Sequence, residues 1–215
     1  MVNLAQELSH IYWIGGSPCA GKTTIARKLA AEYGFAYYKC DDCYDDHMCR
    51  STPDQHPNMY KIKDLTWNQV WSTQFCFLSI KEQIEDVVRV YEEQFSLILE
   101  DLLARPKTTP IIAEGAALLP HKVAPLLTDL NHAIWMVPTP EFQVEHYKNR
   151  EWIHGILDQY ENPDLAFSNW MKRDNGFALN VVRDAEDMGL QTLNVDGSFS
   201  IHDNLMIIKQ QFGLS

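Results

Sequence analysis

The fold is decided by the stretch Gly16-Ser17-Pro18-Cys19-Ala20-Gly21-Lys22-Thr23, which fits the pattern G-x-x-x-x-G-K-[ST]. Glycines at this spacing let the backbone curl so that successive N–H groups point inward at phosphate oxygens. The lysine of such a loop reaches the β- and γ-phosphates of a nucleotide, and the hydroxyl that follows it can hold magnesium. The residues assigned to this nucleotide-binding loop are Gly16, Ser17, Pro18, Cys19, Ala20, Gly21, Lys22, Thr23 and Thr24.

The flanks of the loop predict a strand before it and a helix after it. Residues 11–14 are a short apolar run that ends in Gly15-Gly16, as a buried strand would. After the loop, apolar residues recur at helical spacing until Gly34 stops them. The amino terminus of that helix adds positive potential at the loop, which favours bound phosphate.

Strands and helices keep alternating along the rest of the chain. Further strands are predicted over 35–38, 110–113, 133–137 and 190–195, and helices over 66–78, 82–104, 162–188 and after Ser200. The helix over 162–188 is either continuous or broken near Asn175-Gly176, and 45–64 is interpreted as a loop or short irregular helix. Short, fully apolar strands alternating with helices predict a parallel sheet covered on both faces.

Three of the predicted helices carry expectations about their side chains. A capping box is predicted at Thr66, and Trp67 and Trp71 are expected in the core. The seven acids and two bases between Lys81 and Asp101 are interpreted as a solvated helix face. In the last helix the side chains expected to face inward are those of Ile201, Leu205, Ile208 and Phe212.

The composition limits the class of protein. A chain of 215 residues that is 46% hydrophobic and 22% charged is predicted to form a single domain, 1–215. The formal charge of −11 leaves no broad basic surface, so a nucleic-acid polymer is an unlikely partner. No secretory signal and no apolar run of membrane-spanning length is present, which predicts a soluble, cytoplasmic protein with no membrane partner. The five cysteines are expected to be reduced thiols, and zinc at Cys40-x-x-Cys43 with His47 and Cys49 is the alternative considered.

With the loop and the alternation in place, the chain resembles the P-loop small-molecule kinases of the nucleoside, nucleotide, gluconate and shikimate type. The resemblance spans nearly the whole chain, although only the phosphate loop is specific. It implies the three-layer P-loop NTPase fold, with a five-stranded parallel sheet in the order 2-3-1-4-5, helices on both faces and a helical lid. It also implies ATP and Mg²⁺ as cofactors, and transfer of the γ-phosphate to a small-molecule acceptor.

The acceptor site is expected after the second strand. Uridine-kinase-like members carry Asp-x-Phe-Tyr there, and its aspartate takes the proton from the attacking hydroxyl. This chain has Asp41-Asp42-Cys43-Tyr44, which departs at Cys43. The resemblance implies Asp41 as the catalytic base, with Asp42 or Tyr44 holding substrate in an acceptor region of about 42–105. A merely solvated acidic turn is the alternative.

Other strand ends supply the remaining candidates. Glu114, after the third strand, resembles the acid that serves magnesium or substrate in the family, while a helix cap or salt bridge is the alternative. The lid is expected over about 141–160, with Arg150 as its catalytic arginine and Arg173 as a weaker candidate. Family lids usually carry two closely spaced arginines, whereas here Arg150 is followed by His154. Asp196-Gly197-Ser198, after the fifth strand, resembles the segment that wraps adenine in these kinases. A tight turn between a strand and a helix would explain the same residues equally well.

Two other functions stay open beside that of a kinase. One is a nucleotide-binding regulator that hydrolyses ATP slowly or not at all, and the other is a kinase of nucleotides or nucleic-acid ends. A guanine-reading switch is weakly supported, because the nearest string, Met171-Lys172-Arg173-Asp174, lacks the leading Asn or Thr of the base-reading motif. A hydroxyl acceptor is favoured over a phosphate, since the carboxylate of Asp41 would repel a phosphate.

Overall fold

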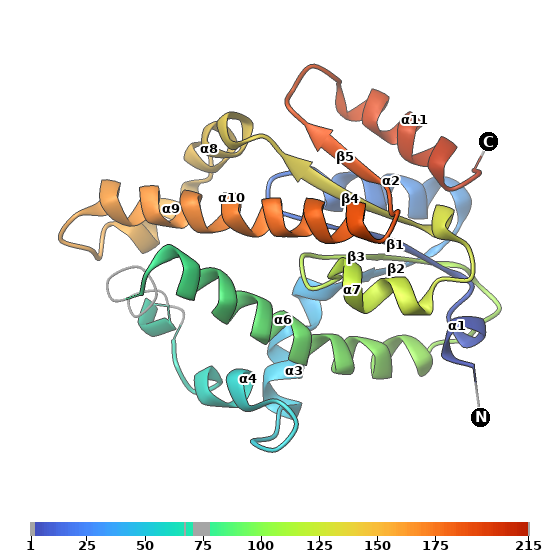
Figure 1. Cartoon of the computed structure of the whole chain (residues 1–215), viewed down its shortest axis with the longest axis horizontal. Helices are drawn as coiled ribbons and strands as arrows, with labels where there is room; N and C mark the ends of the chain where they lie inside the picture. Colours follow the sequence, from blue (N-terminus) through green and yellow to red (C-terminus); the bar gives the residue numbers. More distant parts are fainter. Residues whose placement is uncertain (1–2, 67, 71–77, 215) are drawn as a thin grey trace.

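A computed structural model describes residues 3–66, 68–70 and 78–214. Its centre is a sheet in the order β2-β3-β1-β4-β5, in which every neighbouring pair is parallel (Figure 1). The predicted parallel sheet and its strand order are therefore confirmed. The strands are β1 (Ile11–Gly16), β2 (Ala36–Lys39), β3 (Ile111–Glu114), β4 (Ala133–Pro138) and β5 (Thr192–Val195).

Helices cover both faces of the sheet, because parallel strands need crossover connections. One face carries α2 (Lys22–Tyr33) and α11 (Ile201–Gln211), and the other carries α6 (Ile80–Leu103), α7 (Pro120–Val123) and α10 (Pro163–Asp187). Successive strand residues point to opposite faces. Trp13 therefore joins the core beneath α6 and α10, and Ile14 joins the core beneath α2 and α11.

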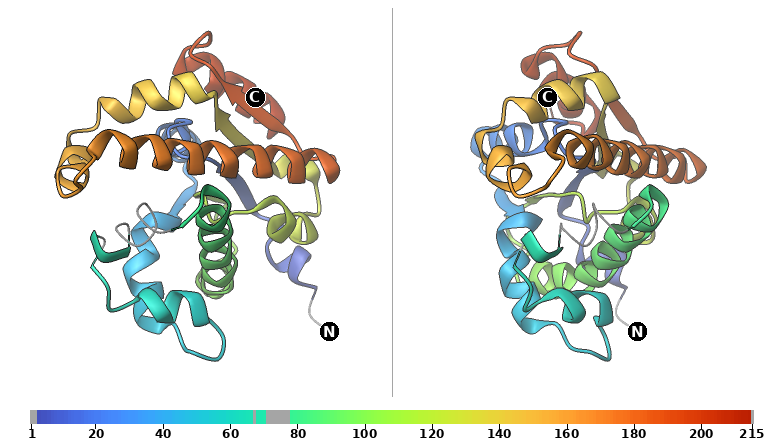
Figure 2. Two further views of the ribbon diagram at one scale, coloured as in Figure 1. Left: turned by 60° about the vertical axis from the view of Figure 1, so that its left-hand side comes forward. Right: turned by 90° about the vertical axis from the view of Figure 1, so that its left-hand side faces the viewer.

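Two groups of short helices extend from this frame. The first follows β2 and comprises a 3₁₀ turn, η1 (Cys40–Cys43), with α3 (Tyr44–Arg50) and α4 (Pro57–Ile62); it packs against α6, away from α11 (Figure 2). The second follows β4 and comprises α8 (Pro140–Lys148) and α9 (Glu151–Leu157). The remaining short elements are α1 (Leu4–Glu7), η2 (Ala124–Leu126) and η3 (Leu130–His132).

The segment predicted as a loop or irregular helix, 45–64, contains two defined helices. The amino terminus of α4 is capped from another element, because the Glu93 carboxylate accepts the backbone N–H groups of Asn58 at 3.0 Å and Met59 at 2.8 Å. An acid satisfies the unpaired N–H groups of a first helical turn. Since Glu93 lies on α6, no local pattern in 45–64 could reveal this cap.

Helix α10 is continuous, so the break considered near Asn175-Gly176 is absent. Gly176 instead marks a close approach of two helices. A Cβ atom there would lie 2.3 Å from Cδ1 of Ile84 on α6. The glycine has therefore a packing role, which is a frequent reason for glycine inside a helix.

The other expectations about helices are met unevenly. Thr66 and Gln69 form the predicted capping box, through Thr66 N–H to Gln69 Oε1 at 2.8 Å and Gln69 N–H to Thr66 Oγ1 at 3.3 Å. Trp67 and Trp71 lie outside the described residues, and Leu78 lies in a bend rather than in the predicted helix. Ile201 is 39% exposed, so its inward placement was wrong, whereas Leu205, Ile208 and Phe212 are buried as expected. None of the helices described is long and apolar enough to cross a membrane.

Candidate nucleotide and acceptor site

The sheet register brings the candidate residues to one edge. Glu114 pairs in register with Ile14 of β1 and with Lys39 of β2, so β2 and β3 end level with each other and β1 continues for two more residues to Gly16. The chain after β1 is the glycine loop, and the chain after β2 is η1, which carries Asp41. Ligands bind outside the carboxyl ends of parallel strands in open α/β sheets.

The first residues of the glycine loop lie in close contact with β4. Ser17 N–H donates to Met136 O at 3.1 Å, and a Cβ at Gly16 would lie 2.0 Å from the same oxygen. Gly16 has φ +118°, and further along the loop Cys19 and Gly21 have φ values of 69° and 85°. These left-handed residues curl the backbone toward the amino terminus of α2, and their conformation favours glycine.

Lys22 folds back over this loop. Its Nζ donates to Ser17 O at 2.7 Å, and the residue is only 8% exposed. Burial lowers the pKa of Lys22, while the charges of Glu114 and Asp41 act in the opposite direction. Ser17 Oγ is buried with no hydrogen-bond partner in the described part of the chain. The loop therefore holds an enclosed ammonium group and an unsatisfied hydroxyl, a setting that suits an anionic ligand.

Glu114 is a buried carboxylate at the end of β3, 1% exposed. Its Oε1 accepts a hydrogen bond from Thr23 Oγ1 at 2.9 Å and another from Tyr37 Oη at 2.9 Å. A carboxylate beside a hydroxyl offers the hard oxygen ligands that Mg²⁺ prefers, and this ion usually takes few protein ligands beside phosphate oxygens and water. Thr23 and Glu114 therefore fit the predicted magnesium site.

Two cavities meet at Asp41. The first, here called the loop cavity, has a volume of about 470 Å³ and is lined by Lys22, Thr23, Glu114 and Arg150 among others. The second, here called the aromatic cavity, has a volume of about 450 Å³. The residues that line both are Pro18, Asp41, Tyr91, Tyr147 and Trp152. Asp41 is the one carboxylate in this shared wall, and its side chain forms no hydrogen bond or ion pair within the described residues.

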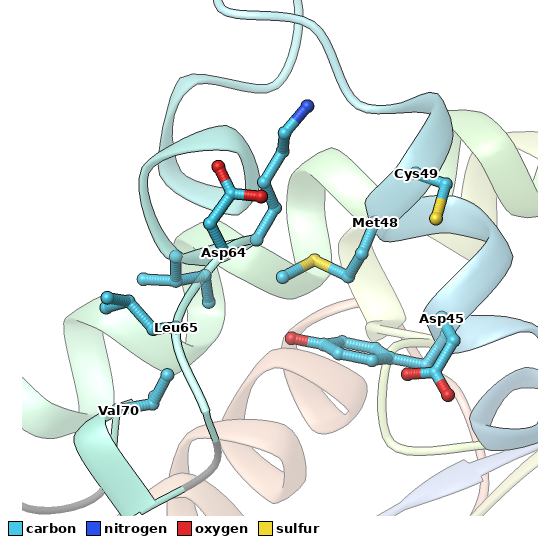
Figure 3. A pocket seen from close by; sticks show the side chains of 9 residues that line it. Asp45, Met48, Cys49, Asp64, Leu65 and Val70 are labelled. Atoms are coloured by element: carbon cyan, nitrogen blue, oxygen red, sulfur yellow. The ribbon is translucent and has the colours of Figure 1, made fainter.

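The aromatic cavity adjoins a third one, here called the outer cavity, of about 460 Å³. Both are lined by Tyr44, Asp45, Ile62 and Val70. Figure 3 shows Met48, from α3, on the opposite side of the outer cavity from Leu65 and Val70. The space beyond Asp41 thus continues outward along α3.

The predicted acceptor residues differ in their placement. Tyr44 lines the aromatic and outer cavities, and burial raises its pKa to about 12. Asp42 lines neither the aromatic nor the loop cavity, and its carboxylate instead forms an ion pair with Lys39 at 2.7 Å. Asp41 and Tyr44 are therefore brought together at the cavities, and Asp42 points elsewhere.

Arg150 lies between α8 and α9, at the N-cap position of α9 where its side chain makes no capping bond, and it lines the loop cavity. Its guanidinium lies 4.8 Å from the ring centre of Tyr147 and 5.8 Å from that of Trp152. Burial raises the pKa of the Cys19 thiol, and the charge of Arg150 acts in the opposite direction. Arg150 thus connects the segment predicted as the lid to the phosphate loop.

The turn Asp196-Gly197-Ser198 is closed by its own aspartate, whose Oδ1 accepts Ser198 N–H at 2.8 Å and Ser198 Oγ–H at 2.5 Å. These bonds are those of a tight turn, and its residues line neither the loop nor the aromatic cavity. The turn contacts α8, and α11, which follows the turn, approaches the loop. A Cβ at Gly21 would approach Ile201 at 3.2 Å, and one at Gly197 would approach Phe142 of α8 at 3.1 Å.

The aromatic walls were missed by the sequence analysis. Tyr91 comes from α6, Tyr147 from α8 and Trp170 from α10, so residues far apart in sequence form one surface. Beneath them, Arg173 Nε and Nη2 donate to Asp174 Oδ1 at 2.9 Å and 2.7 Å, and Tyr147 Oη donates to Asp174 Oδ2 at 2.9 Å. No local signal connects these helices.

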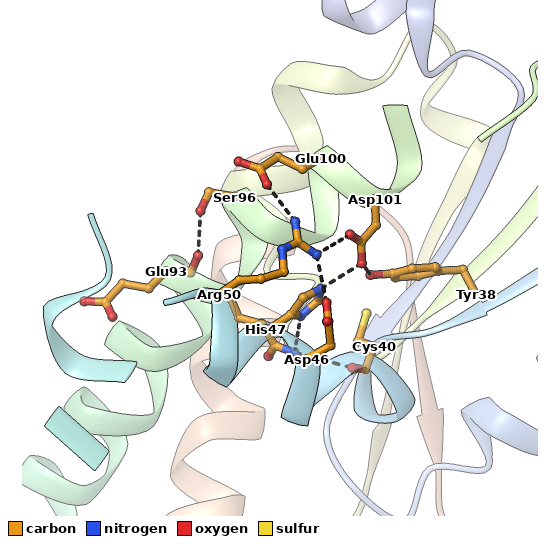
Figure 4. A network of polar contacts seen from close by, with 10 residues as sticks. Tyr38, Cys40, Asp46, His47, Arg50, Glu93, Ser96, Glu100 and Asp101 are labelled. Carbon is orange, nitrogen blue, oxygen red and sulfur yellow. Dashed lines mark hydrogen bonds and ion pairs between the residues drawn. The ribbon is translucent and has the colours of Figure 1, made fainter. Parts of the chain in front are cut away.

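A polar network fastens η1 and α3 to α6 (Figure 4). Asp101 Oδ2 accepts Tyr38 Oη–H at 2.8 Å and lies 2.8 Å from His47 Nε2, while its Oδ1 accepts Arg50 Nη1–H at 2.7 Å. On the other side of the buried imidazole, Gln94 Nε2 lies 3.3 Å from His47 Nδ1. His47 is thus held within this network by Asp101 and Gln94. The zinc site considered at Cys40, Cys43, His47 and Cys49 is not supported, since the described residues contain no group of three or more His, Cys, Asp or Glu side chains that could hold a metal. Asp101 and Glu93 show that the acids of α6 are not merely a solvated face.

Replacement of Asp101 by asparagine is expected to destabilise the protein in a pH-dependent way. Burial would raise the pKa of Asp101, but hydrogen bonds from Arg50, His47 and Tyr38 hold it below its ordinary value. A depressed folded-state pKa stabilises the protein above the unfolded-state pKa, and this stabilisation disappears as the pH falls through the folded-state pKa. Asp101→Asn should therefore lower the free energy of unfolding by about 1–2 kcal/mol at pH 7, and the difference from the wild type should shrink between about pH 5 and pH 3.

Urea unfolding at pH 7, 5 and 3.5 measures this dependence. Glu100→Gln is the matched control, because Glu100 is 63% exposed and shares only a surface ion pair with Arg50. An equal loss for Asp101→Asn at all three pH values would show that the carboxylate charge does not stabilise the network.

Comparisons of the sequence with protein-family models and with curated proteins give no match. A function for this chain must therefore be argued from its own residues. Their geometry combines an anion-binding loop, an oxygen-rich pair for a cation and a carboxylate between two cavities. Together these groups suit an anionic ligand with a bound cation beside a second small molecule.

Proposed function

We propose that this protein is an ATP- and Mg²⁺-dependent phosphotransferase of the P-loop kinase type, which moves the γ-phosphate to a hydroxyl of a small molecule. The observation that carries the proposal is the position of Asp41 in the wall shared by the loop cavity and the aromatic cavity. A general base must reach the acceptor hydroxyl, and that hydroxyl must lie beside the phosphate it attacks. A carboxylate at the junction of two cavities meets both conditions.

The nucleotide would lie in the loop cavity. Backbone N–H groups of residues 16–24 would bind its phosphates, and Lys22 would exchange its bond with Ser17 O for one with a phosphate oxygen. Thr23 and Glu114 would hold Mg²⁺, which supplies charge neutralisation at the phosphates. The turn 196–198, beside Phe142, stays the predicted neighbour of the adenine base.

The acceptor would lie in the aromatic cavity with its hydroxyl at Asp41. As its oxygen forms a bond with the γ-phosphorus, the bond from that phosphorus to the oxygen bridging the β-phosphate breaks. ADP leaves with the electron pair of that bond, and the hydroxyl proton passes to the Asp41 carboxylate. Lys22 and Arg150 would balance the charge of the moving phosphoryl group.

Truncation of Arg150 is expected to lower kcat about a hundredfold, since it removes a cation from the loop cavity. Arg150→Lys should recover little, because lysine lacks the planar fork that binds two phosphate oxygens. Steady-state kinetics with ATP as the varied substrate measure this. Lys148→Ala is the control, as Lys148 is an exposed cation two residues away. If Arg150→Ala and Lys148→Ala behave alike, Arg150 has no part in the transfer.

The function is tested by a screen for ATP consumption and phosphorylated product across nucleosides, nucleotides, sugar acids, amino sugars and vitamin precursors. Lys22→Ala serves as the inactive control. A phosphorylated alcohol made by the wild type and not by this variant is the expected result. If the protein binds ATP but yields no phosphorylated product with any acceptor, it is a nucleotide-binding regulator instead.

A further inference from the structure

The aromatic cavity has an excess of negative charge. Asp41 and Asp45 both line it, and neither carboxylate has a hydrogen bond or ion pair with another residue of the described chain. Among the described lining residues Arg173 is the one cation, and it is bonded to Asp174 at 2.7 Å, so its charge is balanced within the wall. Asp41 is close enough to Lys22, in the loop cavity, for its charge to raise the pKa of that lysine, but neither Asp41 nor Asp45 is bonded to a cation among the described residues.

The walls around these carboxylates are aromatic. The rings that line the cavity belong to Tyr44, Tyr91, Tyr147, Trp152 and Trp170. The face of such a ring attracts a cation. The protein itself shows this at the far wall, where the guanidinium of Arg173 lies 5.9 Å from the ring centre of Trp170. Carboxylates among aromatic rings form an environment that stabilises a bound cation.

We infer that the acceptor is an alcohol that carries a protonated amine, with its hydroxyl at Asp41 and its ammonium group at Asp45. This inference rests on the proposed function and names the substrate class of the same site. Asp41 and Asp45 are four residues apart on the helical turns of η1 and α3, and both side chains reach one cavity. Because both carboxylates line one cavity, one small molecule can place its hydroxyl at Asp41 and its ammonium group at Asp45.

Charge also selects against anionic acceptors. A phosphate or carboxylate in this cavity would face Asp41 and Asp45, while the cations Lys22 and Arg150 line the loop cavity on the other side of Asp41, and like charges placed together disfavour binding. The outer cavity also has more acids than bases among its described lining residues, since Asp45 and Asp64 line it together with one cation, Lys63. The Lys63 ammonium group lies 4.3 Å from the ring centre of Tyr60. An acceptor with a second amine can therefore extend outward past Asp45.

The test compares alcohols that share a skeleton and differ in charge. One set is 4-(aminomethyl)benzyl alcohol, 4-methylbenzyl alcohol and 4-(hydroxymethyl)benzoate, and a second set is glucosamine, glucose and glucuronate. Binding to the whole protein is followed by tryptophan fluorescence, because Trp152 and Trp170 line the cavity. In at least one set the amine should bind about ten times more tightly than the neutral alcohol, and the acid more weakly than both.

Asp45→Asn should abolish most of this preference, because it should weaken the binding of the amine and leave the binding of the neutral alcohol unchanged. Asp54→Asn is the matched control: it removes the same charge from an exposed position outside the three cavities and should leave the preference unchanged. If no amine binds more tightly than its neutral parent in either set, the inference is wrong. The wild-type comparison decides this whether or not the variants fold.

The same ligands separate this inference from the proposed function. Preferred binding of an amine without any phosphoryl transfer from ATP would refute the phosphotransferase and leave the charge preference of the cavity standing. Faster phosphorylation of the neutral or acidic alcohols than of the amines would refute the inference that the acceptor carries an amine. The proposal of a phosphotransferase would then still stand.

Discussion

Lys22→Ala is expected to lose ATP binding and to reduce kcat/KM for ATP about a thousandfold. The variant removes an ammonium group that is enclosed by the loop, 8% exposed and already within hydrogen-bond distance of the backbone. A preorganised donor in such a site contributes more to stabilising developing charge than it would in water. Equilibrium titration with ATP and initial rates with an identified acceptor give the two quantities.

The control for this prediction lies on the same helix. Lys28 is exposed on α2, so Lys28→Ala removes the same charge without touching the loop. Circular dichroism of both variants separates a loss of binding from a loss of folding. Normal ATP affinity in Lys22→Ala would refute the assignment of the loop as the nucleotide site.

Asp41→Asn is expected to lower kcat by a factor of about a hundred to ten thousand while ATP affinity changes little. Asparagine keeps the size of the side chain but cannot take the hydroxyl proton. Because Asp41 forms no hydrogen bond or ion pair with another described residue, its replacement leaves no buried partner unsatisfied, and stability should be unaffected.

The measurement pairs single-turnover phosphoryl transfer with ATP titration. Asp46→Asn is the control, since Asp46 is exposed on α3 and pairs with Arg50 at the surface. Full activity in Asp41→Asn would mean that the acceptor proton goes to another group. Weakened ATP binding in the same variant would instead place Asp41 at the nucleotide rather than at the acceptor.

The sheet could be predicted from the sequence because its signals are local. Strand β4 is buried at every position, and its sequence is an unbroken apolar run. The glycine-loop motif likewise predicts the helix that follows it, α2. The strand order came with the resemblance and is confirmed by the pairing of β1 with β3 and β4. The nucleotide, the magnesium ion and the reaction stay predictions.

What the sequence did not reveal depends on contacts between distant elements. The cap of α4 comes from Glu93, and the anchor of His47 comes from Asp101, each more than thirty residues away. The aromatic cavity needs side chains of three helices at once. Ile201 follows the helical pattern of its neighbours yet lies beside Gly21 at the surface, because periodicity gives a face but not its limits.

The attachment of the acceptor region to α6 has a consequence for how such a chain could diversify. The segment from η1 to α4 is fastened to this helix by polar contacts of Glu93 and Asp101, while the glycine loop and Glu114 belong to the sheet. A substitution in α3 or α4 can therefore reshape the wall of the aromatic cavity without moving the strands. New acceptor chemistry can arise in a replaceable module while the phosphate-handling part of the molecule is inherited unchanged.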